Sequence, residues 1–321
     1  MDLAVYLPLL LPLCAAAGAG PLAVRLPPIV ATWLLTSAAV ALAALSTAAL
    51  GLLAFTAVLR IPLVASLGHL SAAVIRREDP ASLTAALAAA ALLAAAVLAA
   101  TRTGSRRVRA LLSAAREARC LPGSGQVVVI PDGAADAYTM PGRPGRIVVT
   151  AGMLDALDPA ERQVLLAHEH THAAGHHYLF IAFSHFAAAA NPLLRPVAAA
   201  VSYTVERWAD ETAAGSCGNR QLAARAVGKA ALAAHRTGGL PGQAPAASTG
   251  IGGPVLHPVR RLGRRPGLVP RRVAALLAPA PRVHPWLVAA AAAVVLVSAT
   301  AALDATYELH ALIELAQTPA A

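Results

Sequence analysis

An uncharged run from Ile29 to Leu59 is the feature that most restricts how this chain can fold. A helix of about 20 apolar residues suffices to cross a bilayer. The composition points the same way, because only 13% of the residues are charged, whereas soluble domains carry about 25%. We therefore interpret the chain as an α-helical protein of the cell membrane, with the lipid bilayer as one of its partners.

Other apolar segments extend this reading into a multi-pass topology. Leu3–Val24 and Ser82–Thr101 add two helices, so that residues 1–101 are expected to form an N-terminal membrane region with about three transmembrane helices. A C-terminal transmembrane helix is expected over 285–303, followed by a short tail over 304–321. The shorter stretch 61–75 is interfacial or re-entrant, and the sequence leaves the two open.

Positive charges gather at both ends of the region between these membrane segments. Arginines follow Thr101 directly, and others precede Trp286. The positive-inside rule therefore places residues 102–284 in the cytoplasm, although Arg60, Arg76 and Arg77 then lie on the opposite side and conflict with it. This placement also accounts for the net charge of +10, and no nucleic-acid motif is present, so no nucleic-acid partner is expected. The three cysteines are scattered without C-x-x-C spacing, which fits a reducing compartment.

The middle region has the signals of a mixed α+β domain. Short β-branched segments predict strands at Gln126–Pro131 and Arg146–Thr150. A helix is predicted after Asp158, with Asp158 as N-cap, Glu161 completing a capping box and Gly175 at the C-terminal end. Residues 178–205 are apolar but interrupted by prolines, which leaves a helical hairpin and a membrane-dipping segment as alternatives. The uncharged Gly/Pro-rich stretch 237–256 is expected to be a flexible loop.

The predicted helix carries the motif H-E-x-x-H at His168, Glu169 and His172. Residues four apart lie on one helical face, so both imidazoles can reach a single ion. Zinc binds imidazole nitrogen, and the adjacent Glu169 is placed to act as general base. We expect His170 to face away from the ion.

A third ligand is needed to complete such a site. In the pattern H-E-x-x-H-x-x-G-x-x-H the last position is Tyr178 here, so we interpret His176 and His177 as helix-end or surface residues. The later segment VERWADETAA offers Glu206 as third metal ligand. Asp210 lies one turn further on the same face, where it can accept a hydrogen bond from a ligand histidine.

The combination of H-E-x-x-H with E-x-x-A-D at Glu206, Ala209 and Asp210, between membrane helices, resembles the membrane-embedded gluzincin peptidases. It is most similar to the M56 family of BlaR/MecR-type metallopeptidases, with the related M48 family of Ste24/HtpX-type peptidases as the alternative. The segment from Ala137 to Glu169 resembles both families in the order of its turn, strand and zinc helix.

This resemblance implies a fold and a set of roles. It implies an α-helical membrane protein with an embedded α+β metallopeptidase domain, built from the H-E-x-x-H helix, a short β-sheet and the E-x-x-x-D helix. One Zn²⁺ per chain would be held by His168, His172 and Glu206, with Glu169 as catalytic base and a protein or peptide as substrate. A strand of Ile147, Val148, Val149 and Thr150 would be the edge that binds the substrate backbone by strand addition.

One departure from the M56 pattern and two other function classes complete the interpretation. Antibiotic-sensing members carry a penicillin-binding domain with an S-x-x-K nucleophile after the last helix, whereas only Asp304–Ala321 follow here. We therefore do not expect β-lactam sensing by this chain alone, and any signal would have to come from a separate sensor partner or from the membrane. The peptidase could serve regulation by removing a cytoplasmic repressor. The non-enzymatic alternative is a membrane signalling or scaffold protein with a structural zinc site, and a transporter is disfavoured by the scarcity of charge within the spans.

Overall fold

The computed structural model describes residues 3–59, 83–142, 145–237, 249–250 and 267–317. The predictions for 61–75, and for 237–256 apart from Thr237 and the pair 249–250, therefore lie outside the described residues. The helices are η1 Leu3–Tyr6, α1 Leu7–Arg25, α2 Pro28–Leu59, α5 Leu83–Cys120, α6 Ala151–Ala156, α7 Pro159–Ala174, α8 His177–Ala190, η2 Pro192–Leu194, α9 Arg195–Cys217, α10 Arg220–Arg236, α11 Leu268–Leu277 and α12 Pro285–Gln317. The strands are β1 Val127–Ile130, β2 Ala137–Met140, β3 Arg146–Thr150 and β4 Thr249–Gly250.

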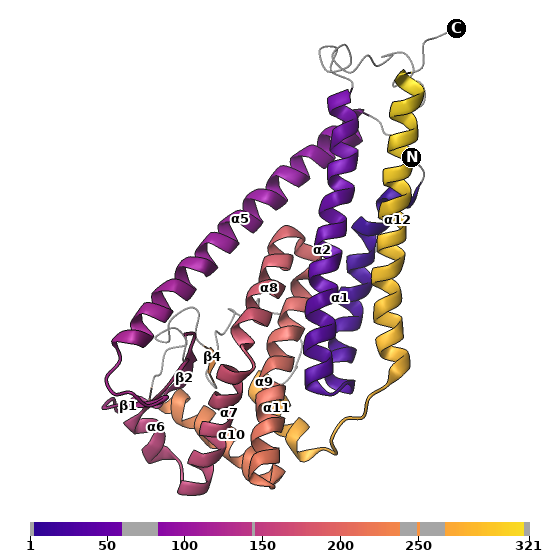
Figure 1. The fold of residues 1–321 in the computed structure, drawn as a ribbon. Coiled ribbons are helices and arrows are strands. Elements are labelled where there is room, and N and C mark those ends of the chain that lie inside the picture. The colour runs from indigo at the N-terminus through magenta and orange to yellow at the C-terminus, as the bar shows by residue number, and fades with distance from the viewer. Residues whose placement is uncertain (1–2, 60–82, 143–144, 238–248, 251–266, 318–321) are drawn as a thin grey trace.

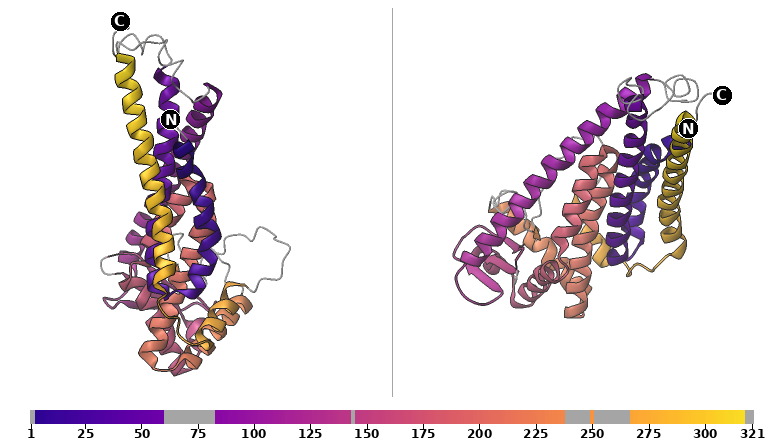
Figure 2. Two further views of the ribbon diagram at one scale, coloured as in Figure 1. Left: turned by 90° about the vertical axis from the view of Figure 1, so that its right-hand side faces the viewer. Right: turned by 45° about the horizontal axis from the view of Figure 1, so that its top comes forward.

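Four helices, α1, α2, α5 and α12, are long and apolar enough to cross a membrane. Within the described residues this agrees with the predicted three N-terminal spans and one C-terminal span. Helices α1, α2 and α12 stand side by side, whereas α5 runs obliquely away from them to the sheet (Figure 1, and the right-hand view of Figure 2). The chain is thus a multi-pass helical membrane protein with a small α+β part at one end.

The predicted boundaries at residues 101 and 303 do not coincide with helix ends. Helix α5 continues without interruption to Cys120, and α12 continues to Gln317. The change from apolar to charged composition marks where a helix would leave the bilayer, but it does not stop the helix. The residues after Thr101 are mostly Ala, Leu and Arg, which are strong helix formers. Helix α5 therefore connects the membrane part to the sheet as one rigid element.

The sheet has the strand order β1-β3-β2-β4. Strand β3 pairs in parallel with β1 on one side and antiparallel with β2 on the other. The prediction that Ile147–Thr150 is an exposed edge for substrate is therefore wrong: its backbone groups are used within the sheet. Its continuous Val/Ile run reflects cover on both faces. Ile147 and Val149 pack toward Met153 and Leu165, while Val148 packs with Ala114 and Ala118 of α5.

Helix α7 is fixed at its N-terminus by the predicted capping box. Asp158 accepts a hydrogen bond from the backbone of Glu161, and the Glu161 side chain accepts one from the Asp158 backbone, both at 3.0 Å. Glu161 is fully buried, and Arg225 and Lys229 of α10 form ion pairs with its carboxylate at 2.9 and 2.6 Å. Local sequence therefore starts the helix, and α10 holds its start in place.

Residues 178–205 form a helical hairpin of α8 and α9 with η2 at its tip. Its inner face packs on α1 and α2, with Phe180 edge-on to Trp33 and the Thr32 hydroxyl 2.9 Å from that of Thr204. At the tip, Asn191 donates a hydrogen bond to Ser46. The helical hairpin allowed by the sequence is therefore observed, and its helix α8 is apolar but shorter than a membrane span.

Gly152 provides a test of the packing around the sheet. A Cβ at this position would lie 2.1 Å from the backbone oxygen of Gly133. Gly152→Ala should therefore lower the free energy of unfolding by about 1–3 kcal/mol, as for other overpacked sites. Gly228→Ala on α10 is the matched control, since a Cβ there meets nothing within 4 Å, and it should stabilise by about 0.5–1 kcal/mol. Thermal unfolding in detergent measures both, and equal effects of the two substitutions would contradict this view of the packing.

Candidate metal centre

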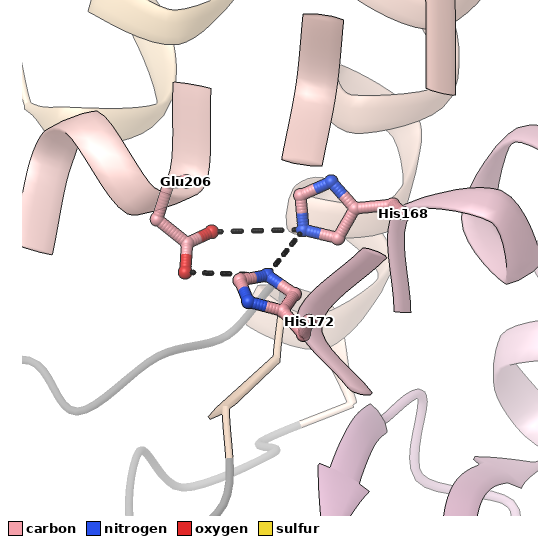
Figure 3. Close-up of side chains that lie close together, drawn as sticks. All are labelled: His168, His172 and Glu206. Carbon is pink, nitrogen blue, oxygen red and sulfur yellow. Dashed lines mark hydrogen bonds and ion pairs between the residues drawn. The ribbon is translucent and has the colours of Figure 1, made fainter. Parts of the chain in front are cut away.

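Three side chains from two helices converge on one point (Figure 3). His168 and His172 come from α7 and Glu206 from α9, and their potential ligand atoms all lie within 4.8 Å of one another. The two imidazole Nε2 atoms are 3.1 Å apart. The Glu206 carboxylate places Oε2 3.7 Å from Nε2 of His168 and Oε1 3.7 Å from Nε2 of His172. All three residues predicted as ligands are therefore brought together.

These distances suit a small tetrahedral ion. With ligand bonds of about 2.0–2.2 Å, neighbouring ligand atoms in a tetrahedral zinc site lie roughly 3.3–3.6 Å apart. Two nitrogens and one carboxylate oxygen also form the donor set of one class of catalytic zinc site, in which a fourth position stays open. The histidines are buried and Glu206 is 17% exposed, so the site is reached from the side of Glu206.

Asp210 occupies the place predicted for it beside His168. Its Oδ1 lies 3.0 Å from Nδ1 of His168, on the side of the ring that faces away from Glu206. Because Nε2 faces the other candidate ligands, we assign a hydrogen to Nδ1, the nitrogen that faces Asp210. This contact fixes the tautomer and the orientation of the ring.

Arg272 of α11 links both carboxylates of α9. It donates to Asp210 through Nε and Nη2 at 2.7 and 2.6 Å, and its Nη1 lies 2.8 Å from Oε2 of Glu206. From the sequence, Arg272 is only one of several arginines that precede the last membrane helix. In the structure its side chain is 3% exposed and belongs to the site. No local pattern connects it with Asp210, which is 62 residues earlier in the chain.

The pKa values of the two candidate ligand histidines are shifted in opposite directions. Burial opposes protonation of both, but hydrogen bonds with Asp210 and Glu206 outweigh it at His168 and raise its pKa to about 9. At His172 burial dominates, and the neighbouring positive charges lower the pKa further below its ordinary value. Burial would raise the pKa of Asp210, but Arg272 overcomes this and keeps it well below the usual range. The carboxylate of Asp210 therefore stays ionised.

Glu169 is buried next to the ligands and is oriented by β2. The Thr139 hydroxyl lies 2.8 Å from the backbone oxygen of Glu169 and 3.0 Å from its Oε2. Thr139 therefore links β2 to both the backbone and the carboxylate of Glu169. Strand β2 was not predicted, because four residues, AYTM, carry too little periodicity to identify a strand. Strand β2 is thus the strand that contacts the Glu169 carboxylate, through Thr139.

The remaining histidines of the motif region divide into two groups. His170 is exposed, as expected from its helical position, and His176 is exposed too. His177 does lie at a helix end, as the first residue of α8, but the expectation that it is a surface residue was wrong: it is fully buried, and its Nδ1 lies 2.9 Å from Nδ1 of His172. The prediction failed because a new helix starts at His177 and turns its side chain back toward α7.

Arg272→Lys should weaken zinc binding by about 10–100-fold, the usual cost of losing a partner of a metal ligand. A lysine keeps the charge but cannot bridge two carboxylates with a planar fork. Arg271→Lys is the control, since Arg271 stacks on Tyr203 with its guanidinium carbon 4.4 Å from the ring centre and should not affect the metal. Competition with a chromophoric chelator measures both affinities. Equal affinities for the two variants would exclude Arg272 from the site.

Zinc binding should release protons near neutral pH. The metal-free site holds a proton on His168, whose pKa is raised to about 9, and zinc needs the lone pair on Nε2. A proton therefore competes with zinc below about pH 9, so the apparent affinity should fall as the pH is lowered. Calorimetry at about pH 7 in two buffers with different ionisation enthalpies should detect about one released proton. A pH-independent affinity would contradict this assignment.

Comparison with known proteins gives one match. The model of peptidase family M48 matches residues 102–185, which include α7 and the H-E-x-x-H motif but end before Glu206. No curated protein and no solved structure matches the chain. The match supports a relationship to peptidase family M48 and indicates a metallopeptidase.

Proposed function

We propose that this protein is an integral membrane zinc endopeptidase of the gluzincin type, which hydrolyses peptide bonds of a protein or peptide substrate. The observation that carries the proposal is the convergence of His168, His172 and Glu206 beside the buried acid Glu169. The family match over α7 supports the peptidase class. The donor set suits zinc better than calcium or magnesium, which prefer oxygen ligands.

A zinc ion at this centre would supply Lewis acidity, polarising a substrate carbonyl and making a water molecule more acidic. Glu169 then takes the proton of the attacking water and transfers it to the leaving amine. Thr139 keeps the Glu169 carboxylate in position for both transfers. Because Thr139 contacts the Glu169 carboxylate, we propose that the substrate backbone approaches the site near Thr139.

The membrane setting suggests where the enzyme works. With four candidate spans and arginines on both flanks of the catalytic part, we propose that this part faces the cytoplasm. The H-E-x-x-H and E-x-x-A-D motifs with this helical layout also support a relationship to the M56 branch. A role in regulatory proteolysis, with a cytoplasmic repressor or a membrane protein as substrate, fits that position.

Glu169→Gln tests the mechanism. The amide cannot accept the proton, so cleavage should fall by about 10²–10⁴-fold, while the zinc content should be unchanged because His168, His172 and Glu206 remain. The measurement is cleavage of a fluorescently labelled unfolded protein by the full chain in proteoliposomes, together with zinc content by mass spectrometry. Glu117→Gln, an exposed acid on α5, is the control and should cleave as wild type does.

Two outcomes would reject the proposal. Wild-type cleavage by Glu169→Gln would show that Glu169 is not the base. Stoichiometric zinc without cleavage of any labelled protein by the wild type would favour the structural-zinc scaffold instead.

A further inference from the structure

His177 is a fully buried histidine for which the proposed mechanism has no use. Its Nδ1 lies 2.9 Å from Nδ1 of His172. Its Nε2 forms no hydrogen bond to any residue that the structure describes. A buried imidazole with a single polar contact needs an explanation, because burying an unpaired polar group costs free energy.

The direction of this one contact follows from the metal centre. Nε2 of His172 faces His168 and Glu206, so the hydrogen of a neutral His172 ring must be on Nδ1. That hydrogen can be donated only if Nδ1 of His177 accepts it. His177 is fully buried, and burial disfavours a charged imidazole, so the neutral ring can offer the lone pair of Nδ1.

The same arrangement exists at the other ligand. Nδ1 of His168 faces Asp210 at 3.0 Å, just as Nδ1 of His172 faces His177. Each metal-binding imidazole therefore has one partner on its outer nitrogen, an anion for His168 and a neutral ring for His172. Such partners fix the tautomer and the orientation of ligand histidines.

The backbone around His177 is shaped to bring this ring inward. His176 has a φ of 48°, the only positive φ among the described residues other than glycine, and it lies in the turn between α7 and α8. A Cβ on Gly175 would lie 2.6 Å from Nε2 of His177. A left-handed residue and a glycine on consecutive positions thus turn the chain back and leave room for the imidazole.

Aromatic side chains hold the ring from the other side. The ring centres of His177 and Trp208 are 4.6 Å apart, and those of His177 and Phe180 are 6.4 Å apart. Trp208 is two residues from Glu206 on α9. The ring is therefore clamped between the two helices that supply the ligands.

We propose that His177 is a positioning residue of the metal centre, which accepts the Nδ1 hydrogen of His172 and thereby directs Nε2 of His172 to the ion. This inference rests on the proposed function only as far as metal binding is concerned. It requires no hydrolysis. Its tests therefore use the metal as their readout.

Two substitutions of His177 separate positioning from packing. His177→Phe retains an aromatic ring against Trp208 and Phe180 but removes the acceptor, and it should weaken zinc binding by about 10–100-fold. His177→Asn places an amide oxygen close to the former position of Nδ1 and should recover most of that affinity. If the role were only to fill space, phenylalanine would be the better replacement, so the order of the two affinities decides.

Gly175→Ala provides an independent test that leaves the imidazole in the chain. The added methyl group must displace the His177 ring, so this variant should bind zinc as weakly as His177→Phe. Gly215→Ala on α9, where a Cβ meets nothing within 4 Å, is the control and should bind like wild type. If His177→Phe does not fold, the two glycine variants decide alone.

The measurements are zinc affinity by chelator competition and the visible absorption spectrum of the full-length protein loaded with Co²⁺ in detergent. The spectrum should change in His177→Phe and Gly175→Ala and return toward wild type in His177→Asn. A wild-type zinc affinity and a wild-type spectrum in His177→Phe would overturn the inference. If His177→Phe does not fold, the same result in Gly175→Ala would overturn it. Loss of cleavage in Glu169→Gln has no bearing on it, so a failure of the peptidase proposal and a failure of this one are distinguishable.

Discussion

The candidate metal centre depends on the contact between α7 and α9. These helices are separated in the chain by the whole of α8, yet two candidate ligands come from one and the third from the other. About one turn before His168 on α7, Val164 packs with Ala213 and Ala214 of α9 in a common buried cluster. Because alanine side chains are small, they allow the two helices to approach each other closely. This close approach brings the carboxylate of Glu206 near both imidazoles.

Charge balance around this contact explains why an arginine is buried there. Glu169, Glu206 and Asp210 bring three carboxylates into a largely buried space, which would be costly for unpaired charges. Arg272 is bound to two of them. With a divalent cation at the ligands, the cluster approaches neutrality. Helix α11 is thereby part of the centre, although it supplies no ligand.

Helix α9 belongs to the metal centre and to the membrane part at the same time. Glu206 and Asp210 face α7. On another side, Arg207 donates hydrogen bonds to the carbonyl oxygens of Ala23 and Val24 at the end of α1, at 2.6 and 3.4 Å. One helix therefore fixes the distance between the first membrane helix and the ligands. The inward turn at His176 adds α8 to the same unit, because His177 contacts both His172 and Trp208.

Local sequence determined much of this protein. Uninterrupted apolar runs predicted the spans, because a helix must satisfy its own backbone in lipid. The capping box and the i, i+4 histidines predicted α7 and two ligands, because both patterns act within one helix. Glu206 and Asp210 were predicted from their E-x-x-x-D spacing together with the H-E-x-x-H motif.

What only the tertiary structure decided are contacts between residues far apart in the chain. The inner position of β3, the orientation of Glu169 by Thr139, and the binding of Asp210 by Arg272 all arise when separate elements pack together. His177 was misread for a related reason: its role is set by a left-handed turn, which a periodic pattern does not encode. The sequence thus determined which residues can bind an ion, and tertiary packing decided which others hold them in place.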